Sequence, residues 1–170
     1  MDPQIKVGIG YDSHRFTPNR PLVLGGVIIP HHKGLAGHSD ADVLLHAIAD
    51  ALLGAAGLGD IGTHFPDIDE KYKDIKSTRL LAVVFEKIIK HGFLIGNVDS
   101  VIIAETPRIN PHIPIMKRKI SKILVMTEQN ISIKATSNEK MGFIGREEGI
   151  AVMATASIYK DDGTISSTDK

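Results

Sequence analysis

Two short stretches of the sequence carry aspartate and histidine at spacings that place them on one face of a regular element. Asp12 and His14 are two residues apart in an extended segment, so their side chains point the same way. Asp42, His46 and Asp50 recur at every fourth position of a strongly apolar helix, which stacks them along one side. Ionisable groups are costly to bury alone, so these positions indicate a metal, a counter-charge or a substrate.

Each pattern also has an ordinary structural explanation. The helical residues could form a polar stripe along a solvated edge, and Asp12 with His14 could make one orienting hydrogen bond. Between positions 21 and 70, however, the chain has one lysine and no arginine to pair with the carboxylates. Together, Asp12, His14 and His46 would supply three nitrogen and oxygen ligands and leave one tetrahedral position open, which is typical of catalytic zinc.

A second chemically suggestive run is TSNEK at 136–140, which follows a predicted strand and precedes a glycine-rich loop. Its hydroxyls, backbone N–H groups and carboxylate suit phosphate oxygens and a second hard cation. The sequence contains neither a Walker motif nor GxGxxG, which argues against a standard nucleotide-binding fold. The residues alone therefore predict a site for metal-assisted phosphoryl transfer.

The composition narrows the class of protein. Twenty basic residues balance twenty acidic ones in 170 residues, whereas a binder of nucleic acid or of an anionic membrane would show a basic surplus. There is no cysteine, so disulfides, thiolate metal sites and cysteine nucleophiles are excluded, while eight histidines can supply metal ligands. A predicted strand begins within a few residues of Met1 and no apolar run is long enough to span a membrane, so we expect a cytoplasmic protein.

The elements that must hold these residues follow from apolar spacing and from cap signals. Ser39, with Asp42 three residues later, fits a capping box for the central helix, and Ser77 fits an N-cap for the next one. Glycines within 54–59 end the central helix, and segment 60–69, with three aspartates and one histidine, is expected to be an irregular loop. The other predicted elements are strands at 5–11 with an extended continuation to 16, 97–105, 131–136 and 149–160, an extended segment at 21–30 bent at Gly25-Gly26, helices at 77–92 and 110–124, and a loop at 137–148.

The order of these elements predicts an α+β domain with a mixed sheet and the helices packed on one face. Residues 1–160 are expected to form this single domain, and the polar residues 161–170 a disordered tail. The strands at 101–103 and 152–154 are apolar at successive positions, so both sheet faces need cover. Since the helices suffice for one face, we expect the other to be buried in an oligomer; the alternative is an exposed apolar surface.

Several long stretches of the chain resemble the family of the 2-C-methyl-D-erythritol 2,4-cyclodiphosphate synthases. They are GIGYDSHRF at 8–16, LGGVIIPHHKGLAGHSDADVLLHAIADALLGAAGLGDIG from 24 with FPD at 65–67, NVDSVIIAETPR at 97–108, and KATSNEKMGFIGREEGIA at 134–151. The resemblance, from about residue 5 to 160, implies an enzyme of the non-mevalonate isoprenoid pathway. It also implies a homotrimer with active sites between adjacent subunits, each holding zinc and a second divalent cation, magnesium or manganese.

The resemblance assigns roles to individual residues. It implies zinc on Asp12, His14 and His46, with the first two also bordering the substrate, and phosphate contacts from His38 and Ser39. The implied methylerythritol pocket is formed by Asp60, Gly62, Phe65, Asp67 and Asp69. The implied cytidine pocket spans Ala104 to Asn110 and includes Arg108. The implied diphosphate contacts are Thr136, Ser137 and Glu139, and Glu139 would also hold the second cation. The implied lining of the trimer's central cavity includes Phe143 and Arg146, and some relatives hold an isoprenoid diphosphate in this cavity. His38 and Ser137 are the implied catalytic groups.

The chain departs from the family pattern at a few positions. Ser137 and Asn138 stand where the family usually has threonines, and Ser137 keeps the hydroxyl. Arg108 replaces a common lysine and keeps the charge, whereas Asn110 replaces an apolar residue beside the cytosine. Asp50 is interpreted as a partner of a metal ligand rather than as a ligand.

The implied reaction is a cyclisation of 4-diphosphocytidyl-2-C-methyl-D-erythritol 2-phosphate to 2-C-methyl-D-erythritol 2,4-cyclodiphosphate, with CMP as the leaving group. A protein with this task positions and neutralises phosphates rather than forming a covalent intermediate. Two alternatives stay open. One is a metal-dependent phosphoesterase that uses the same ligands to activate water, and the other is a non-catalytic binder of isoprenoid diphosphates.

Overall fold

Five strands form one sheet in the computed structural model, which describes residues 5–66 and 75–160. In spatial order they are β4 (Gly34–Leu35), β1 (Ile5–Thr17), β7 (Gly149–Lys160), β5 (Phe93–Ile103) and β6 (Ile131–Thr136). β7 pairs antiparallel with both β1 and β5, while β5 and β6 are parallel, so the sheet is mixed as predicted. Asp67, Asp69 and the expected tail at 161–170 lie outside the described residues.

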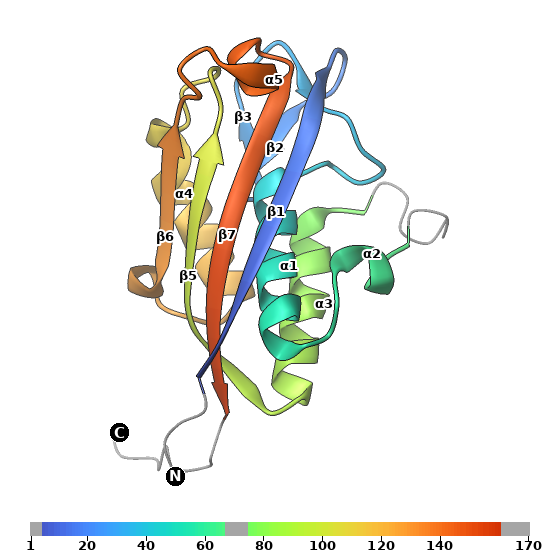
Figure 1. Cartoon of the computed structure of the whole chain (residues 1–170), viewed down its shortest axis with the longest axis vertical. Helices are drawn as coiled ribbons and strands as arrows, with labels where there is room; N and C mark the ends of the chain where they lie inside the picture. The colour runs from blue at the N-terminus through green and yellow to red at the C-terminus, as the bar shows by residue number, and fades with distance from the viewer. Residues whose placement is uncertain (1–4, 67–74, 161–170) are drawn as a thin grey trace.

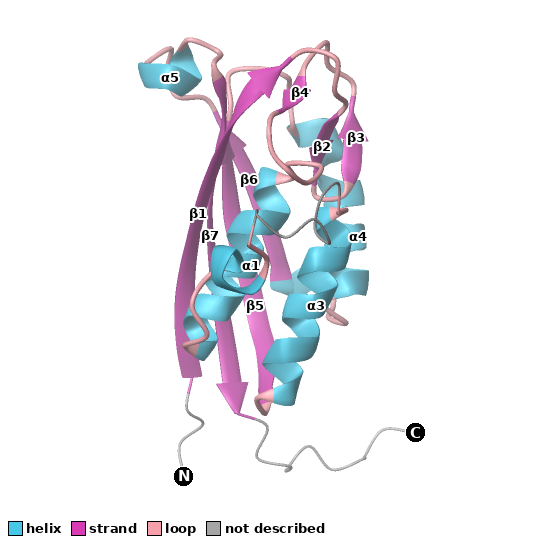
Figure 2. Ribbon diagram, turned by 90° about the vertical axis from the view of Figure 1, so that its right-hand side faces the viewer, coloured by secondary structure: helices cyan, strands magenta, loops and turns pink. Residues whose placement is uncertain are grey.

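The three longest helices cover one face of this sheet (Figures 1 and 2). α1 (Val43–Ala56) lies against β1 and β7 and packs on α3 (Ser77–Lys90), and α4 (Ile113–Ile123) packs on β6. The predicted α+β class with helices on one face is therefore confirmed. The remaining elements are a hairpin of β2 (Leu22–Leu24) and β3 (Val27–Ile29), the short helices α2 (Ile61–His64) and α5 (Gly142–Gly145), and the 3-10 turns η2 (Asn110–His112) and η3 (Glu128–Asn130).

Helix α1 is the centre of the core. Eleven of its fourteen residues are buried, which is expected of a helix that is apolar almost all the way round. Strand β1 can approach α1 closely because two of its residues that face the helix, Gly8 and Gly10, have no side chain. A Cβ at Gly10 would lie 2.0 Å from the carbonyl oxygen of Ala47, and one at Gly8 equally close to that of Ala51. These two glycines therefore set how closely α1, and His46 with it, approaches β1.

The opposite side of β1 carries an apolar row. Ile5, Val7, Ile9 and Tyr11 alternate with the helix-facing residues and are 54–69% exposed. Met153 of β7, the register partner of Tyr11, is 42% exposed and extends the row sideways. The predicted uncovered apolar face is thus present in the single chain.

Several predicted boundaries and caps are wrong. The side-chain cap of α1 is Asp42, whose carboxylate accepts from Leu45 N at 3.1 Å, and Ser39 lies before it. Ser77 is the first residue of α3 rather than its cap. The segment from Asp60 begins with α2 instead of an irregular loop, and the loop 137–148 contains α5. Periodicity shows where an apolar helix runs, but caps depend on which side chain reaches the free N–H groups.

Candidate active site

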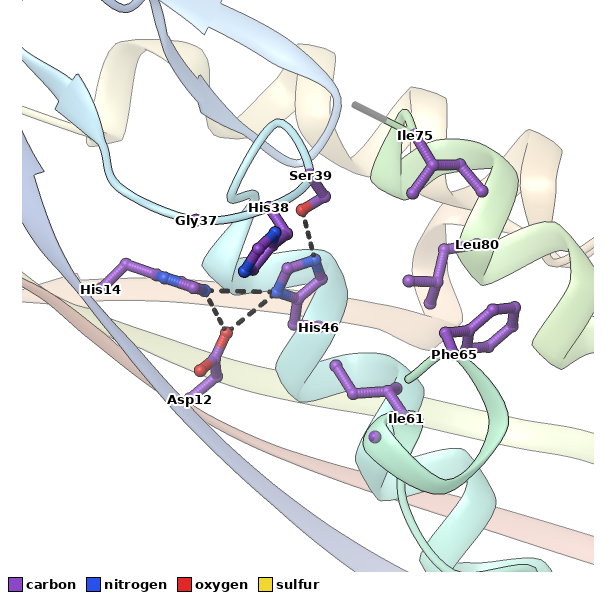
Figure 3. Close-up of a pocket in the computed structure, with 11 residues that line it drawn as sticks. Asp12, His14, Gly37, His38, Ser39, His46, Ile61, Phe65, Ile75 and Leu80 are labelled. Carbon is purple, nitrogen blue, oxygen red and sulfur yellow. Dashed lines mark hydrogen bonds and ion pairs between the residues drawn. The ribbon is translucent and has the colours of Figure 1, made fainter. Parts of the chain in front are cut away.

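The cluster predicted from spacing forms in the structure. β1 brings Asp12 and His14 to the helix side of the sheet, and α1 brings His46 to meet them (Figure 3). Asp12 Oδ2 lies 3.0 Å from His14 Nε2 and 3.1 Å from His46 Nδ1, and the two ring nitrogens are 3.4 Å apart. One carboxylate and two imidazoles with ligand atoms within 4.8 Å of one another fit a divalent metal with an open coordination position.

The other ring nitrogen of His14 is fixed by the backbone. His14 Nδ1 lies 2.7 Å from the carbonyl oxygen of Ala36 and donates to it, which orients the ring with Nε2 toward the cluster. Burial alone would raise the pKa of Asp12, but hydrogen bonds and charge from His14 and His46 outweigh it and hold that pKa well below its usual range. Burial would lower the pKa of His14, and the Asp12 carboxylate outweighs it and raises that pKa. Asp12 is therefore held as an anion among imidazoles, as a metal site requires.

A cavity of about 270 Å³ opens beside the cluster. Its lining brings together seven of the predicted site residues: Asp12, His14, His38, Ser39, His46, Gly62 and Phe65. The apolar wall consists of Ile61, Ile75 and Leu80 as well as Phe65, and Gly37 completes the lining (Figure 3). A polar end with possible metal ligands and an apolar wall opposite suit a small phosphorylated molecule with a hydrocarbon part.

Helix α2 forms one side of this cavity and is tied to α1. Asp60 caps α2 by accepting from Thr63 N at 2.8 Å, and Asp50 of α1 accepts from Ile61 N at 2.8 Å. Burial raises the pKa of Asp50 above its ordinary value, while the Ile61 N–H opposes that shift. The predicted role of Asp50 as a partner of a metal ligand is wrong. Its carboxylate accepts instead from Ile61 N, so Asp50 anchors α2, the helix that carries Gly62.

Asp42, from the same helical stripe, also serves a structural purpose. Its two oxygens accept from Gly25 N at 2.9 Å, Gly26 N at 2.6 Å and Leu45 N, which joins the β2–β3 turn to the start of α1. Full burial raises its pKa to about 6 although the three N–H donors act in the opposite direction. Of the stripe Asp42, His46 and Asp50, only His46 faces the cluster.

The predicted diphosphate and cytidine residues form a separate group at the carboxyl ends of β5 and β6. Ala104 N donates to Thr136 O at 3.0 Å, and Ser137 Oγ donates to Glu139 at 2.9 Å. Glu105, which the sequence did not single out, accepts from the backbone N–H groups of Asn138 and Lys140, both at 3.0 Å. Its carboxylate thus links the predicted cytidine segment, which includes Arg108 and Asn110, to the predicted phosphate loop.

This second group does not line the cavity beside His46. Paired positions across the sheet run from Ser13 through Ala151 and Ile103 to Thr136, which separates the two groups by three strand spacings. At about 4.8 Å per spacing, Ser13 and Thr136 are roughly 14 Å apart. One chain therefore presents two halves of the predicted site on different parts of its surface.

Phe143 and Arg146 lie at a third place. Together with Arg15, Phe16 and Lys33 they border an open cavity of about 860 Å³, and Arg146 Nε pairs with Glu148 at 2.7 Å. The Glu148 carboxylate raises the pKa of Arg146 further. Both residues thus border one cavity of the single chain, and His14 of the cluster also borders it.

Sequence reasoning missed two residues that contact His46 or its neighbours. Ser77 Oγ lies 2.9 Å from His46 Nε2, and Asp40 accepts from the Ser77 hydroxyl at 2.5 Å. Ser77 is 31 positions from His46 in the chain and looked like a helix cap. Only the packing of α3 against α1 reveals the contact.

Among the described residues, no helix is both long and apolar enough to cross a membrane. The sequence matches the model of the YgbB family over residues 5–159. It is 52% identical over 154 residues to the 2-C-methyl-D-erythritol 2,4-cyclodiphosphate synthase of Salinibacter ruber, which covers 91% of this chain and 98% of that protein.

Solved structures agree with this match. The bifunctional IspDF from Campylobacter jejuni superposes with a TM-score of 0.92 at 44% identity, covering 96% of this chain and 44% of that longer chain. IspF of Plasmodium falciparum, solved as a CDP complex, superposes with a TM-score of 0.82 at 35% identity, covering 93% of this chain and 97% of that chain. With this fold, the Asp-His-His cluster and a match along nearly its whole length, the chain belongs to the YgbB family of 2-C-methyl-D-erythritol 2,4-cyclodiphosphate synthases.

Proposed function

We infer that this chain converts 4-diphosphocytidyl-2-C-methyl-D-erythritol 2-phosphate to 2-C-methyl-D-erythritol 2,4-cyclodiphosphate and CMP in the non-mevalonate pathway. The observation that carries this inference is the Asp12–His14–His46 cluster at the polar end of a small cavity, in a member of this family. The proposed reaction takes place where its phosphorylated substrate is made, since such anions do not cross a bilayer, and we expect this to be the cytoplasm.

The reaction forms one phosphorus–oxygen bond and breaks another. An oxygen of the 2-phosphate attacks the β-phosphorus, and the bond from that phosphorus to the oxygen shared with the α-phosphate breaks, so that CMP leaves with this oxygen. No protein nucleophile is required, because the two reacting groups belong to one substrate. The protein contributes by holding them close and in line and by offsetting their charge.

The cavity residues have the proposed task of holding the reacting phosphates. Zinc is the proposed metal on Asp12, His14 and His46, where as a Lewis acid it would polarise a phosphate oxygen. His38 and Ser39, which line the same cavity, would donate to phosphate oxygens. Gly62 and Phe65 on the opposite wall would contact the methylerythritol, together with Asp60 and with Asp67 and Asp69, two residues beyond the described ranges.

The group at the ends of β5 and β6 has the proposed task of binding the nucleotide half. Thr136 and Ser137 would donate to the diphosphate, and Glu139 would hold a second divalent cation, magnesium or manganese. The segment from Ala104 to Asn110, with Arg108, would hold the cytidine. The relative from Plasmodium falciparum that was solved as a CDP complex supports a cytidine nucleotide as the ligand.

These two halves require a second copy of the chain under this proposal. They lie three strand spacings apart in one chain, and the apolar row from Ile5 to Tyr11 offers a surface on which copies can pack. A closed homotrimer would place the phosphate loop of one subunit beside the cluster of the next. Phe143 and Arg146 would then border a central cavity that takes an isoprenoid diphosphate, once the Arg146–Glu148 pair opens.

Sedimentation at micromolar concentration is expected to give a particle of about three times the 18.4 kDa chain mass. A Val7→Glu variant is the matched test of the surface, because Val7 is 69% exposed in the single chain and a glutamate there is tolerated unless the face is buried between subunits. Dissociation of this variant with loss of activity is the expected result. A fully active monomeric wild type would rule out the shared site.

Phosphorus NMR of the purified protein with the proposed substrate and zinc plus magnesium tests the activity itself. The expected spectrum shows a cyclic diphosphate and CMP in equal amounts. A phosphoesterase would instead give an acyclic phosphate that carries oxygen from labelled water. A protein that leaves the substrate unchanged under all metal conditions would contradict the proposed function.

A further inference from the structure

The second ring nitrogen of His46 faces a buried hydroxyl. His46 Nδ1 points to Asp12 and His14, while Nε2 points to the opposite side, 2.9 Å from Ser77 Oγ and 3.3 Å from Ser39 Oγ. Ser77 is fully buried at the start of α3, and His46 is 7% exposed. The nearest hydroxyl to Nε2 is therefore supplied by a fully buried side chain of the protein.

The direction of these hydrogen bonds is fixed by chemistry. A metal on Nδ1 needs the lone pair of that nitrogen, so the ring proton must reside on Nε2, which then acts as a donor. Ser77 Oγ is its nearer acceptor. The Ser77 hydroxyl in turn donates to Asp40 Oδ1 at 2.5 Å, and an ionised carboxylate only accepts. The only consistent order is His46 Nε2–H to Ser77 Oγ–H to Asp40.

Ser39 is the weaker candidate for this acceptor. Its hydroxyl oxygen is farther from Nε2, at 3.3 Å, and already accepts from Ala41 N at 3.0 Å. Ser39 also lines the cavity, where its proposed partner is a substrate phosphate. Ser77 does not line the cavity and so has no competing ligand.

We propose that Ser77 and Asp40 form a relay that positions His46 for metal binding and fixes its proton on Nε2. An anion acting through a hydroxyl makes the imidazole a better ligand, because partial positive charge on the ring is stabilised when Nδ1 donates electron density. Both are positioning residues. The inference rests on the proposed metal site, and it adds a partner that decides how tightly the site holds its ion.

A purely structural role for the pair must be separated from this one. Both oxygens of Asp40 lie 3.2 Å from Ser77 N, so Asp40 also satisfies the first N–H of α3. Ser77→Ala keeps that backbone contact and removes only the hydroxyl. Asp40→Asn removes the charge and keeps one acceptor oxygen for the Ser77 hydroxyl and N–H, while the second oxygen becomes an NH2 donor.

The test measures zinc affinity of the assembled protein by competition with a chromophoric chelator. Ser77→Ala is expected to weaken zinc binding about 10- to 100-fold, the usual effect of losing an outer partner of a ligand histidine, and Asp40→Asn to weaken it less. Ser121→Ala is the matched control, since Ser121 is also buried but donates to the Arg118 carbonyl on α4, away from the cluster. Melting of each zinc-free variant shows whether α3 stays intact. Unchanged affinity in Ser77→Ala would overturn the relay, and unchanged affinity in Asp40→Asn would remove Asp40 from it.

A measurement on the unmutated protein keeps the proposal testable if Ser77→Ala does not fold. In zinc-loaded protein labelled with nitrogen-15, His46 is expected to show a protonated Nε2 whose proton exchanges slowly with water. A proton on Nδ1, or fast exchange at Nε2, would contradict the relay. If the wild type binds no zinc at all, the proposed function fails instead, so the two failures are distinguishable.

Discussion

His46→Ala is expected to lose bound zinc and nearly all cyclisation activity together. His46 is the one member of the cluster that comes from a helix. Its removal would leave a metal with only two protein ligands, Asp12 and His14. Metal stabilisation of phosphate charge is worth several kcal/mol, so the rate is expected to fall on the order of 10³-fold or more. Zinc content by atomic absorption and steady-state kinetics on the same sample are the measurements.

Ser137→Ala is the matched comparison for the phosphate loop. Ser137 is exposed and donates only to Glu139, so its removal is expected to leave zinc content and fold intact. Removing one donor to a developing anion typically costs roughly 10²–10³ in rate, or about 3–4 kcal/mol, with kcat falling more than KM rises. His38→Ala is expected to behave similarly, with weaker substrate binding in addition. Zinc loss in Ser137→Ala, or a full equivalent of zinc in His46→Ala, would show that these roles are assigned wrongly.

Gly10→Ala, which adds a single methyl group, is expected to cause a large loss of folding stability. The new Cβ would meet the Ala47 carbonyl oxygen at 2.0 Å, and both partners are backbone-fixed in the core. Overpacking costs typically 1–3 kcal/mol when side chains can yield, and here α1 itself must move, so we expect about 3 kcal/mol or more. Because His46 precedes Ala47, the same displacement should weaken zinc binding. Urea unfolding of the zinc-free protein and zinc titration measure the two effects.

Gly54→Ala is the control for this substitution. Gly54 is an exposed residue of α1, and its nearest neighbour to a new Cβ is Ile9 O at 3.8 Å, an ordinary contact. Alanine there is expected to stabilise the helix by up to about 1 kcal/mol. If Gly10→Ala proved as stable as Gly54→Ala, β1 and α1 could separate freely, and the close approach would not be what places His46.

Local sequence determined much of the fold and the centre of the site. Residues two apart in a strand share a face, so the pairing of Asp12 with His14 followed from spacing alone. The continuous apolar surface of α1 predicted its burial, and apolar residues on both faces of the strands predicted the uncovered side of the sheet. Each of these inferences uses the regular repeat of side-chain direction along a helix or a strand, which can be read from the sequence.

The tertiary structure alone decided which polar groups meet. Asp42 and Asp50 share the helical stripe of His46, yet their partners are Gly25, Gly26 and Ile61, brought in by other segments. In the same way, Ser77 reaches His46 only because α3 packs on α1. The tertiary structure also places the predicted phosphate loop three strand spacings from the cluster, because the order of strands is a property of the whole sheet. Such contacts join residues far apart in the chain, and no local period records them.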